Sequence, residues 1–373
     1  MRNTDRRPAP PSIREIRDGA WRESEDGAWR PGAPHIRNAW HLACFAHELD
    51  AGILARTLLD EPVVLFRRGD GRVAALEDRC PHVGAPLSRG KLVGANIQCG
   101  YHGLAFDADG RCVEIPGQEI IPPAACVHAY PIEVRAEHVW IWMGDPQLAA
   151  SHAVPDFGGD DDFFRWPRHQ GVIPMRCNYS LMIQNLMDLT HLAYVHADSI
   201  GGDAADHATD EVSVSRTETG MRFVRTMRNV APPGRYVARF GSAERLDRWS
   251  EFEFVAPAVV RQNSGWGRVG TGVIEERGGD LKDKMLHAIT PSTASSSFYF
   301  YDGADGAEPD PARAKQRLSV LDKIIQEDVD MVEAQQARLE GVDPRTLIAV
   351  RSDKARLLMM KELQRRVEAQ AGD

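Results

Sequence analysis

Two histidines and a carboxylate, His191, His196 and Asp188, interrupt an otherwise apolar run that begins at Asn185. Each would cost free energy if it were buried without a partner. In an α-helix, Asp188 and His191 would project from nearly the same face. His191 and His196 lie roughly 140° apart around an ideal helix. If both bind one metal ion, the helix must end or widen between them. The alternative is a helix end with two hydrogen-bonded histidines.

A second set of potential ligands lies in the motifs Cys80-Pro-His82 and Cys99-Gly-Tyr-His102. Two thiolates and two imidazoles suit tetrahedral zinc, and they also suit a [2Fe–2S] cluster in which two histidines replace two cysteines on one iron. Each motif can give one ligand to each iron, and its prolines and glycines make a tight loop whose N–H groups can approach the cluster sulfurs. The cluster is favoured; zinc or no metal remain alternatives. The other cysteines are predicted to be packed thiols: Cys44, Cys112, Cys126 and Cys177.

Asp328 stands on the apolar stripe of a long helix that we expect from about residue 312 to 340. A carboxylate on a buried helix face needs a partner, either a metal ion or an arginine. Glu327 and Asp330 are expected to point elsewhere, into solvent. The helix limits come from an N-cap and proline at Asp310-Pro311 and a stop at Gly341, and the stripe runs through Leu318, Leu321, Ile324/Ile325 and Met331/Val332.

The sequence around these motifs predicts an α+β protein of two domains, residues 35–150 and 151–373. A mobile extension, residues 1–34, is expected to precede them. That extension is rich in Arg, Pro and Gly, and the alternative is an arm packed on a neighbouring subunit. Short apolar runs separated by Gly-Asp turn signals make the first domain all-β. The Pro-, Gly- and Asp-rich stretch 145–162 is expected to be the linker.

In the second domain, the polar run 198–210 is expected to be a surface loop near the site, either a lid or an ordinary mobile loop. Residues 211–301 return to strands, with aromatic residues that pack the core or wall a flat apolar substrate. A charged amphipathic helix is expected over residues 346–370.

Composition excludes several classes of protein. The 373 residues carry 45 Lys+Arg against 54 Asp+Glu, a net charge of −9, which argues against binding nucleic acid or anionic lipid. No apolar run approaches ~20 residues, and no signal peptide is recognisable. Six irregularly spaced cysteines favour a reducing cytoplasm. No Gly-x-Gly-x-x-Gly follows a strand, so the sequence carries no recognisable nicotinamide- or flavin-binding motif.

His191, His196 and Asp328 form the two-histidine, one-carboxylate set of non-haem Fe(II) oxygenases. With the two Cys/His motifs, they make the sequence from about residue 36 onward resemble the α-subunit of Rieske non-haem iron aromatic ring-hydroxylating oxygenases. The resemblance is strongest to the vanillate and dicamba O-demethylase branch. It implies an all-β Rieske [2Fe–2S] domain, with Cys80, His82, Cys99 and His102 as ligands. It also implies a helix-grip catalytic domain, an antiparallel sheet around a long helix, that holds mononuclear Fe(II).

The same resemblance implies a homotrimer in which His102 of one subunit hydrogen-bonds Asp188 of the next, so that Asp188 acts without binding metal. It points to His287, and also Asn185, as substrate contacts. Leu104 departs from the broader family, where Trp often follows the His-Gly pair.

The implied function is a terminal oxygenase. It would use O₂ and electrons from a separate flavin and iron–sulfur reductase, with or without a ferredoxin, to hydroxylate or O-demethylate a small aromatic compound that need not be an acid. Three alternatives stay open: ring dihydroxylation, alkyl or N-methyl hydroxylation at the same iron, and a Rieske electron carrier without oxygenase activity. Pocket shape decides among the oxygenase reactions.

Overall fold

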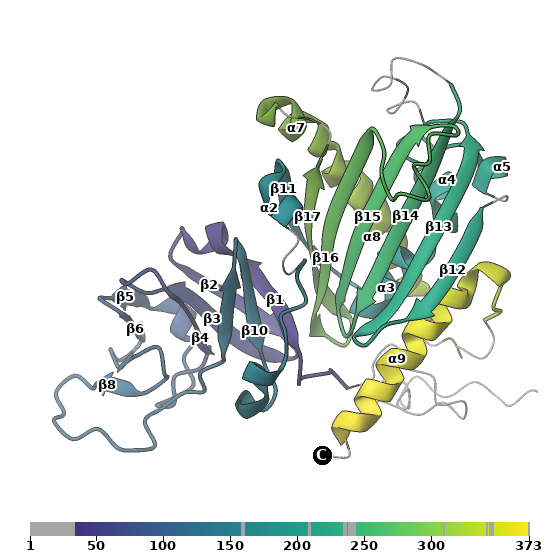
Figure 1. Ribbon diagram of the computed structural model, residues 1–373. Coiled ribbons are helices and arrows are strands. Elements are labelled where there is room, and N and C mark those ends of the chain that lie inside the picture. The colour runs from purple at the N-terminus through teal and green to yellow at the C-terminus, as the bar shows by residue number, and fades with distance from the viewer. Residues whose placement is uncertain are drawn as a thin grey trace, which may run out of the picture.

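The computed structural model describes residues 34–157, 161–207, 210–233, 237, 244–306, 308, 310–340, 342 and 347–371. A smaller β-rich domain lies beside a larger one built on a tall sheet with helices against it (Figure 1). The α+β class is confirmed. The predicted extension of residues 1–34 lies, except for its last residue, outside the described residues, and the domain limits near residue 150 stay a prediction.

The N-terminal domain consists of three small antiparallel sheets. The short strands follow from the sequence, in which apolar runs of a few residues alternate with Gly-containing turns. One sheet has the order β1-β10-β9, the next β2-β3-β4 and the last β5-β6-β7-β8. The strands are β1 (Trp40–Phe45), β2 (Ile53–Leu58), β3 (Glu61–Arg67), β4 (Val73–Glu77), β5 (Lys91–Val93), β6 (Asn96–Gln98), β7 (Ala105–Phe106), β8 (Cys112–Glu114), β9 (Ile132–Arg135) and β10 (His138–Trp142).

The C-terminal domain is built on one seven-stranded antiparallel sheet of order β11-β17-β16-β15-β14-β13-β12. Its strands are β11 (Arg168–Met175), β12 (Glu211–Arg216), β13 (Gly220–Val230), β14 (Leu246–Val255), β15 (Val259–Arg268), β16 (Leu281–Thr293) and β17 (Ser296–Asp305). The helices are α2 (Asp161–Arg165), α3 (Tyr179–Leu186), α4 (Leu192–Val195), α5 (Ala204–His207), α7 (Pro311–Leu318), α8 (Val320–Leu339) and α9 (Lys354–Ala371), with short 3₁₀ turns η1 (Ala46–Leu49), η2 (Leu87–Arg89), η3 (Pro146–Ser151), η4 (Leu189–His191) and η6 (Arg351–Asp353).

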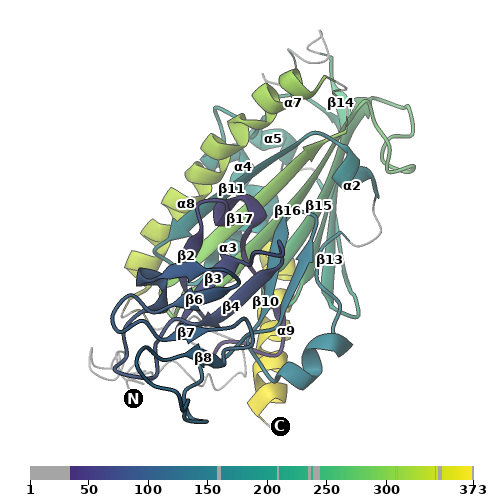
Figure 2. The ribbon, with the colours of Figure 1, turned by 90° about the vertical axis from the view of Figure 1, so that its left-hand side faces the viewer.

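One face of this sheet is covered by helices. Helix α3 packs on β15, β16 and β17, α8 packs on α3 and α4, and α9 lies against β13 at the far edge (Figures 1 and 2). Their shared core mixes apolar residues of both layers, among them Ile183 of α3, Ile325 of α8 and Ile289 of β16. The long helix gripped by a curled sheet confirms the helix-grip expectation.

The other face of the same sheet packs against the N-terminal domain. Successive residues of a strand point to opposite faces. In β16, Leu286 and Ala288 therefore join Trp140 and Trp142 in an interdomain core, while Met285 and Ile289 join the core under the helices. This alternation places His287 on the helix-covered face.

Four predictions differ from the structure. The helix expected over residues 312–340 is interrupted at Ser319 into α7 and α8. The final helix begins at Lys354, later than residue 346. Met331 is exposed, so the apolar stripe continues through Val332 alone. The expected linker 145–162 contains η3 and is anchored in the interdomain core by Val154 and Phe157.

Candidate metal centres

Asp188 breaks the expected helix over residues 185–196 into three pieces. Helix α3 ends at Leu186, and Asp188 is extended, with φ −136° and ψ 100°. Its carboxylate accepts hydrogen bonds from the Thr190 N–H (2.9 Å) and hydroxyl (2.7 Å), the usual role of an N-cap aspartate. A new turn therefore begins at η4, and α4 follows and ends at Val195. The chain thus leaves the helix before His196, as a shared metal requires.

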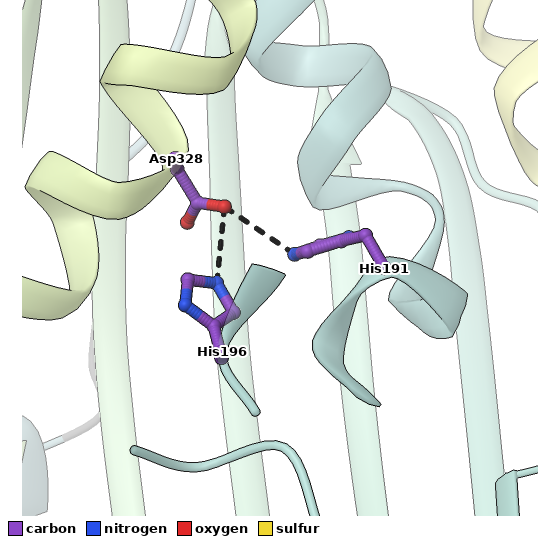
Figure 3. A group of neighbouring side chains, drawn as sticks. All are labelled: His191, His196 and Asp328. Atoms are coloured by element: carbon purple, nitrogen blue, oxygen red, sulfur yellow. Dashed lines mark hydrogen bonds and ion pairs between the residues drawn. The ribbon is translucent and has the colours of Figure 1, made fainter. Parts of the chain in front are cut away.

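His191, His196 and Asp328 converge on one point (Figure 3). Among the described residues, each of the three offers one possible ligand atom, and these atoms all lie within 4.8 Å of one another. The Nε2 atoms of His196 and His191 lie 3.0 and 3.4 Å from Asp328 Oδ1. Asp328 is 4% exposed, so its charge needs compensation inside the protein. Two imidazoles and one carboxylate that share a focus fit a non-haem iron with open positions on one face.

The outer nitrogens of both histidines are also held. His191 Nδ1 lies 2.5 Å from the Asp188 backbone oxygen, and His196 Nδ1 lies 2.7 Å from Glu327 Oε2. Both acceptors favour a proton on Nδ1, which leaves the Nε2 lone pair facing the shared point, as metal binding requires. The expectation that Glu327 points into solvent is wrong, because α4 packs beside α8 at this position. Asp330 is exposed, as expected.

The charges around the two imidazoles differ. Burial lowers the pKa of His191. Burial also opposes the protonation of His196, but the nearby carboxylates of Asp328 and Glu327 outweigh it and raise the pKa of His196. Asn185 donates from Nδ2 to Asp328 Oδ1 over 3.1 Å. Asn185 therefore touches a predicted ligand.

A cavity lies between this set and the sheet. Its walls come from α3, η4, α4, α7, α8 and one face of strands β14 to β17, and include Leu189, Phe252, Met285 and Ile325. Polar groups also reach it from the sheet, namely Arg248, Gln262, Ser264, Asp283 and His287. An apolar cavity with a few polar groups beside a metal set is the usual form of a small-molecule site.

His287 is buried in this cavity wall, consistent with the substrate contact that the resemblance implies. Its Nδ1 lies 2.6 Å from the Tyr299 hydroxyl and its Nε2 lies 3.0 Å from Gln262 Oε1. Burial lowers the pKa of His287 to about 3, so the imidazole is neutral near pH 7. Gln262 and Tyr299 have no local sequence signal and were not predicted. Only the strand register brings them to His287.

The two Cys/His motifs lie in neighbouring loops of the N-terminal domain, after β4 and after β6. Both loops make the same backbone hydrogen bonds. Cys80 N–H donates to Ala85 O and Gly84 N–H to Cys80 O (2.8 and 2.9 Å), and Cys99 N–H donates to Leu104 O and Gly103 N–H to Cys99 O (2.8 and 3.1 Å). Gly84 and Gly103 have φ of 80° and 78°, a conformation that favours glycine. The loops are therefore matching ligand carriers.

The ligands divide into an inner and an outer pair. The Cys80 and Cys99 thiols are buried, and burial raises the pKa of Cys80. The His82 and His102 rings are exposed and pack edge to face, with centroids 4.6 Å apart. Two cysteines on the inside and two histidines outside match the ligand set of a Rieske [2Fe–2S] cluster.

The remaining cysteines only partly follow expectation. Cys44, Cys112 and Cys177 are buried, but Cys126 is exposed, so the prediction that it is packed is wrong. The polar run 198–210 contains α5, where buried His207 contacts Arg225 Nη2 over 2.9 Å. Within the described residues, no helix has the length and apolar character to cross a membrane.

Comparison with known proteins agrees with this geometry. Residues 39–131 match the family model of the Rieske [2Fe–2S] domain, and residues 175–369 match that of the vanillate O-demethylase oxygenase C-terminal domain. The chain is 37% identical over 325 residues to the iron–sulfur subunit of the toluene-4-sulfonate monooxygenase system of Comamonas testosteroni, covering 85% of this chain and 93% of that one. It is 34% identical to the dicamba O-demethylase oxygenase component of Stenotrophomonas maltophilia, covering 90% and 99%.

Solved structures give the same result. The crystal structure of dicamba monooxygenase bound to 3,6-dichlorosalicylic acid superimposes with a TM-score of 0.83 at 32% identity, covering 91% of this chain and all of that chain (100%). Another crystal structure of that enzyme, with non-haem iron and dicamba, has a TM-score of 0.73.

Proposed function

The chain belongs to the Rieske non-haem iron oxygenases of the vanillate and dicamba O-demethylase type, and we propose that it hydroxylates or O-demethylates a small aromatic substrate. Members of this family are oxygenase components of multicomponent systems. They carry a [2Fe–2S] cluster and a non-haem iron and depend on a separate reductase. The observation that carries the proposal is the convergence of His191, His196 and Asp328 beside the cavity.

The iron ligands in this proposal are His191, His196 and Asp328, and the cluster ligands are Cys80, His82, Cys99 and His102. When bound, the iron supplies O₂ activation, so that one oxygen atom enters a substrate C–H bond and the other leaves as water after uptake of two electrons and two protons. Asp328 would balance part of the metal charge, and with the two imidazoles it would hold the ion beside the cavity. Hydroxylation of a methoxy group would give a hemiacetal, which would break down to a phenol and formaldehyde.

The cavity residues support an aromatic substrate with a polar substituent. Phe252 offers an apolar wall. Both nitrogens of neutral His287 are occupied by Tyr299 and by Gln262 Oε1, which orients the Gln262 amide. The Gln262 NH₂ group, which also donates to Ser264, offers a hydrogen bond to a carboxylate, a sulfonate or a phenol without adding charge. The Asn185 Oδ1 atom is buried with no hydrogen-bond partner among the described residues, which leaves an acceptor for a substrate hydroxyl or for water.

Electron transfer between subunits of a homotrimer is part of the proposal. The small sheet of β5 and β6, next to which the cluster loops lie in sequence, is at the opposite side of the chain from α4 (Figure 1). Tyr101 beside the cluster is 68% exposed, and Ile348 is 84% exposed. Asp188, proposed to bridge to the cluster of a neighbour, lies 3.5 Å from Ser352, close in sequence to Ile348. Exposed apolar residues at both places favour contact with a second chain.

Metal and sulfide analysis of anaerobically purified protein tests the assignment of the two centres. We expect three irons for every two acid-labile sulfides per chain, and two irons for two sulfides in His191→Ala. The exposed His128 supplies a matched control, since His128→Ala should keep the full iron content. Two irons for two sulfides already in the wild type, with an unaltered EPR spectrum of the reduced form in His191→Ala, would favour an electron carrier instead.

Turnover tests the reaction. Formaldehyde trapped during turnover with a panel of methoxyaromatic acids would support O-demethylation, and hydroxylated product without formaldehyde would support hydroxylation. A cis-dihydrodiol would favour ring dihydroxylation at the same iron.

A further inference from the structure

The two predicted iron-ligand histidines are held by unlike acceptors. His191 Nδ1 faces the neutral backbone oxygen of Asp188, whereas His196 Nδ1 faces the carboxylate of Glu327 at 2.7 Å. Glu327 precedes Asp328 on α8, and Asp328 Oδ1 lies 3.0 Å from the other nitrogen of the same ring. Consecutive carboxylates of one helix thus contact both nitrogens of His196.

Glu327 is itself fixed in place. Its Oε2 accepts a hydrogen bond from the Ser199 hydroxyl over 3.0 Å, and its Oε1 lies 3.8 Å from Lys323 Nζ, one turn earlier on α8. The Glu327 side chain is only 23% exposed, and that of His196 only 1%. The carboxylate therefore has little freedom to leave the ring, and His196 has no solvent to replace it.

A carboxylate at Nδ1 has two effects on an imidazole. It holds the proton on Nδ1, so that the Nε2 lone pair points to the metal position, and it makes that lone pair more basic. Hydrogen bonds to a charged acceptor are also about twice as strong as those between neutral groups. Without Glu327, the neutral ring could carry its proton on Nε2, which would point a hydrogen atom at the metal.

We propose that Glu327 is a positioning residue for the mononuclear iron, setting the tautomer, orientation and basicity of His196. This inference rests on the proposed function only in that His196 must be an iron ligand. It concerns metal binding and not the reaction, so metal affinity can test it without a substrate.

The experiment measures the affinity of the full-length protein for ferrous iron, by anaerobic competition with a chelator, in wild type, E327A, E327Q and D330N. We expect E327A to bind iron about 10–100-fold more weakly, the usual cost of removing such a partner. E327Q keeps an acceptor oxygen but loses the charge, so its loss should be smaller. Asp330 is exposed on the same helix, where it accepts from Gln326 Nε2 over 2.7 Å, and D330N should bind iron like wild type.

Two further measurements keep the outcomes distinct. The visible absorbance of the [2Fe–2S] cluster reports correct folding in each variant, and E327Q carries the test if E327A fails to fold. The absorption bands of the cobalt(II)-substituted site should shift in E327Q, which a merely structural role would not cause. Wild-type affinity and unshifted bands in both Glu327 variants overturn the inference. If H196A also binds iron normally, the proposed ligand set fails as well.

Discussion

The neutral state of His287 makes a quantitative prediction about stability and pH. Burial lowers its folded-state pKa to about 3, whereas an imidazole in an unfolded chain titrates at 6.5. Between these values the unfolded chain binds the extra proton and the folded chain does not. The contribution of His287 to stability is therefore complete above pH 6.5 and is lost progressively as pH falls toward 3.

The size of the effect at pH 5 follows from these two pKa values. In the unfolded chain at pH 5, the protonated imidazole outnumbers the neutral one by about 30 to 1, while the buried imidazole stays neutral. The free energy of unfolding is therefore about 2 kcal/mol lower at pH 5 than at pH 8. For a domain of this size, that corresponds to roughly 4–8 °C in Tm. Because glutamine does not titrate, the Tm difference between pH 8 and pH 5 should be smaller by this amount in His287→Gln than in wild type.

The assay is thermal unfolding of both proteins at the two pH values, with tryptophan fluorescence as the signal. The comparison uses the change in Tm between the two pH values in each protein. The pH-independent loss of stability caused by the substitution itself therefore cancels. His41 is an independent check in the N-terminal domain, since burial lowers its pKa to about 4 and its Nε2 lies 2.9 Å from Ile36 O. His41→Gln should reduce the slope by a similar amount. The reasoning is refuted if His287→Gln retains the full wild-type slope.

Three further outcomes are expected. Cys99→Ser should lose the visible absorbance and the acid-labile sulfide of the cluster but keep the mononuclear iron, and loss of all iron would contradict independent centres. Asp188→Asn should keep both centres, because asparagine also caps helices, yet slow substrate-dependent reoxidation of the reduced cluster at least tenfold in stopped-flow absorbance. A wild-type rate of cluster reoxidation in Asp188→Asn would contradict a role of Asp188 in electron transfer. Phe300→Ala should cost about 3–5 kcal/mol in chemical denaturation, because Phe300 is 1% exposed in the interdomain core; a cost below about 1 kcal/mol would contradict that packing.

The Rieske cluster could be predicted from the sequence because its determinants are local. Each loop combines a cysteine, a histidine and a glycine within a few residues, and the left-handed φ of Gly84 and Gly103 closes both turns. The convergence of the three proposed iron ligands could be expected for a different reason. His191, His196 and Asp328 are each polar at positions where the apolar pattern predicts burial. The sequence alone therefore indicates that each side chain needs a partner.

What the sequence could not predict depends on how the elements pack. Glu327 looks solvent-facing on a helical wheel, and only the placement of α4 beside α8 brings His196 to it. The contact of His287 with Gln262 requires the register of β15 against β16, in which Val260 lies opposite His287. A shift of one residue would turn every side chain of the strand to the other face. No pattern within a single strand fixes that register.

The break at Asp188 explains how one short stretch can serve two purposes. In a continuous helix, His191 and His196 would lie roughly 140° apart and could not share a small ligand. By leaving the helix, Asp188 turns its backbone oxygen inward to His191 Nδ1 and its carboxylate outward, to Thr190 and toward Ser352. Asp188 therefore orients the proposed iron ligand His191 through its main chain and offers its side chain to the surface. The proposed bridge to the cluster of a neighbouring subunit needs a residue with both contacts, and an uninterrupted helix could not provide it.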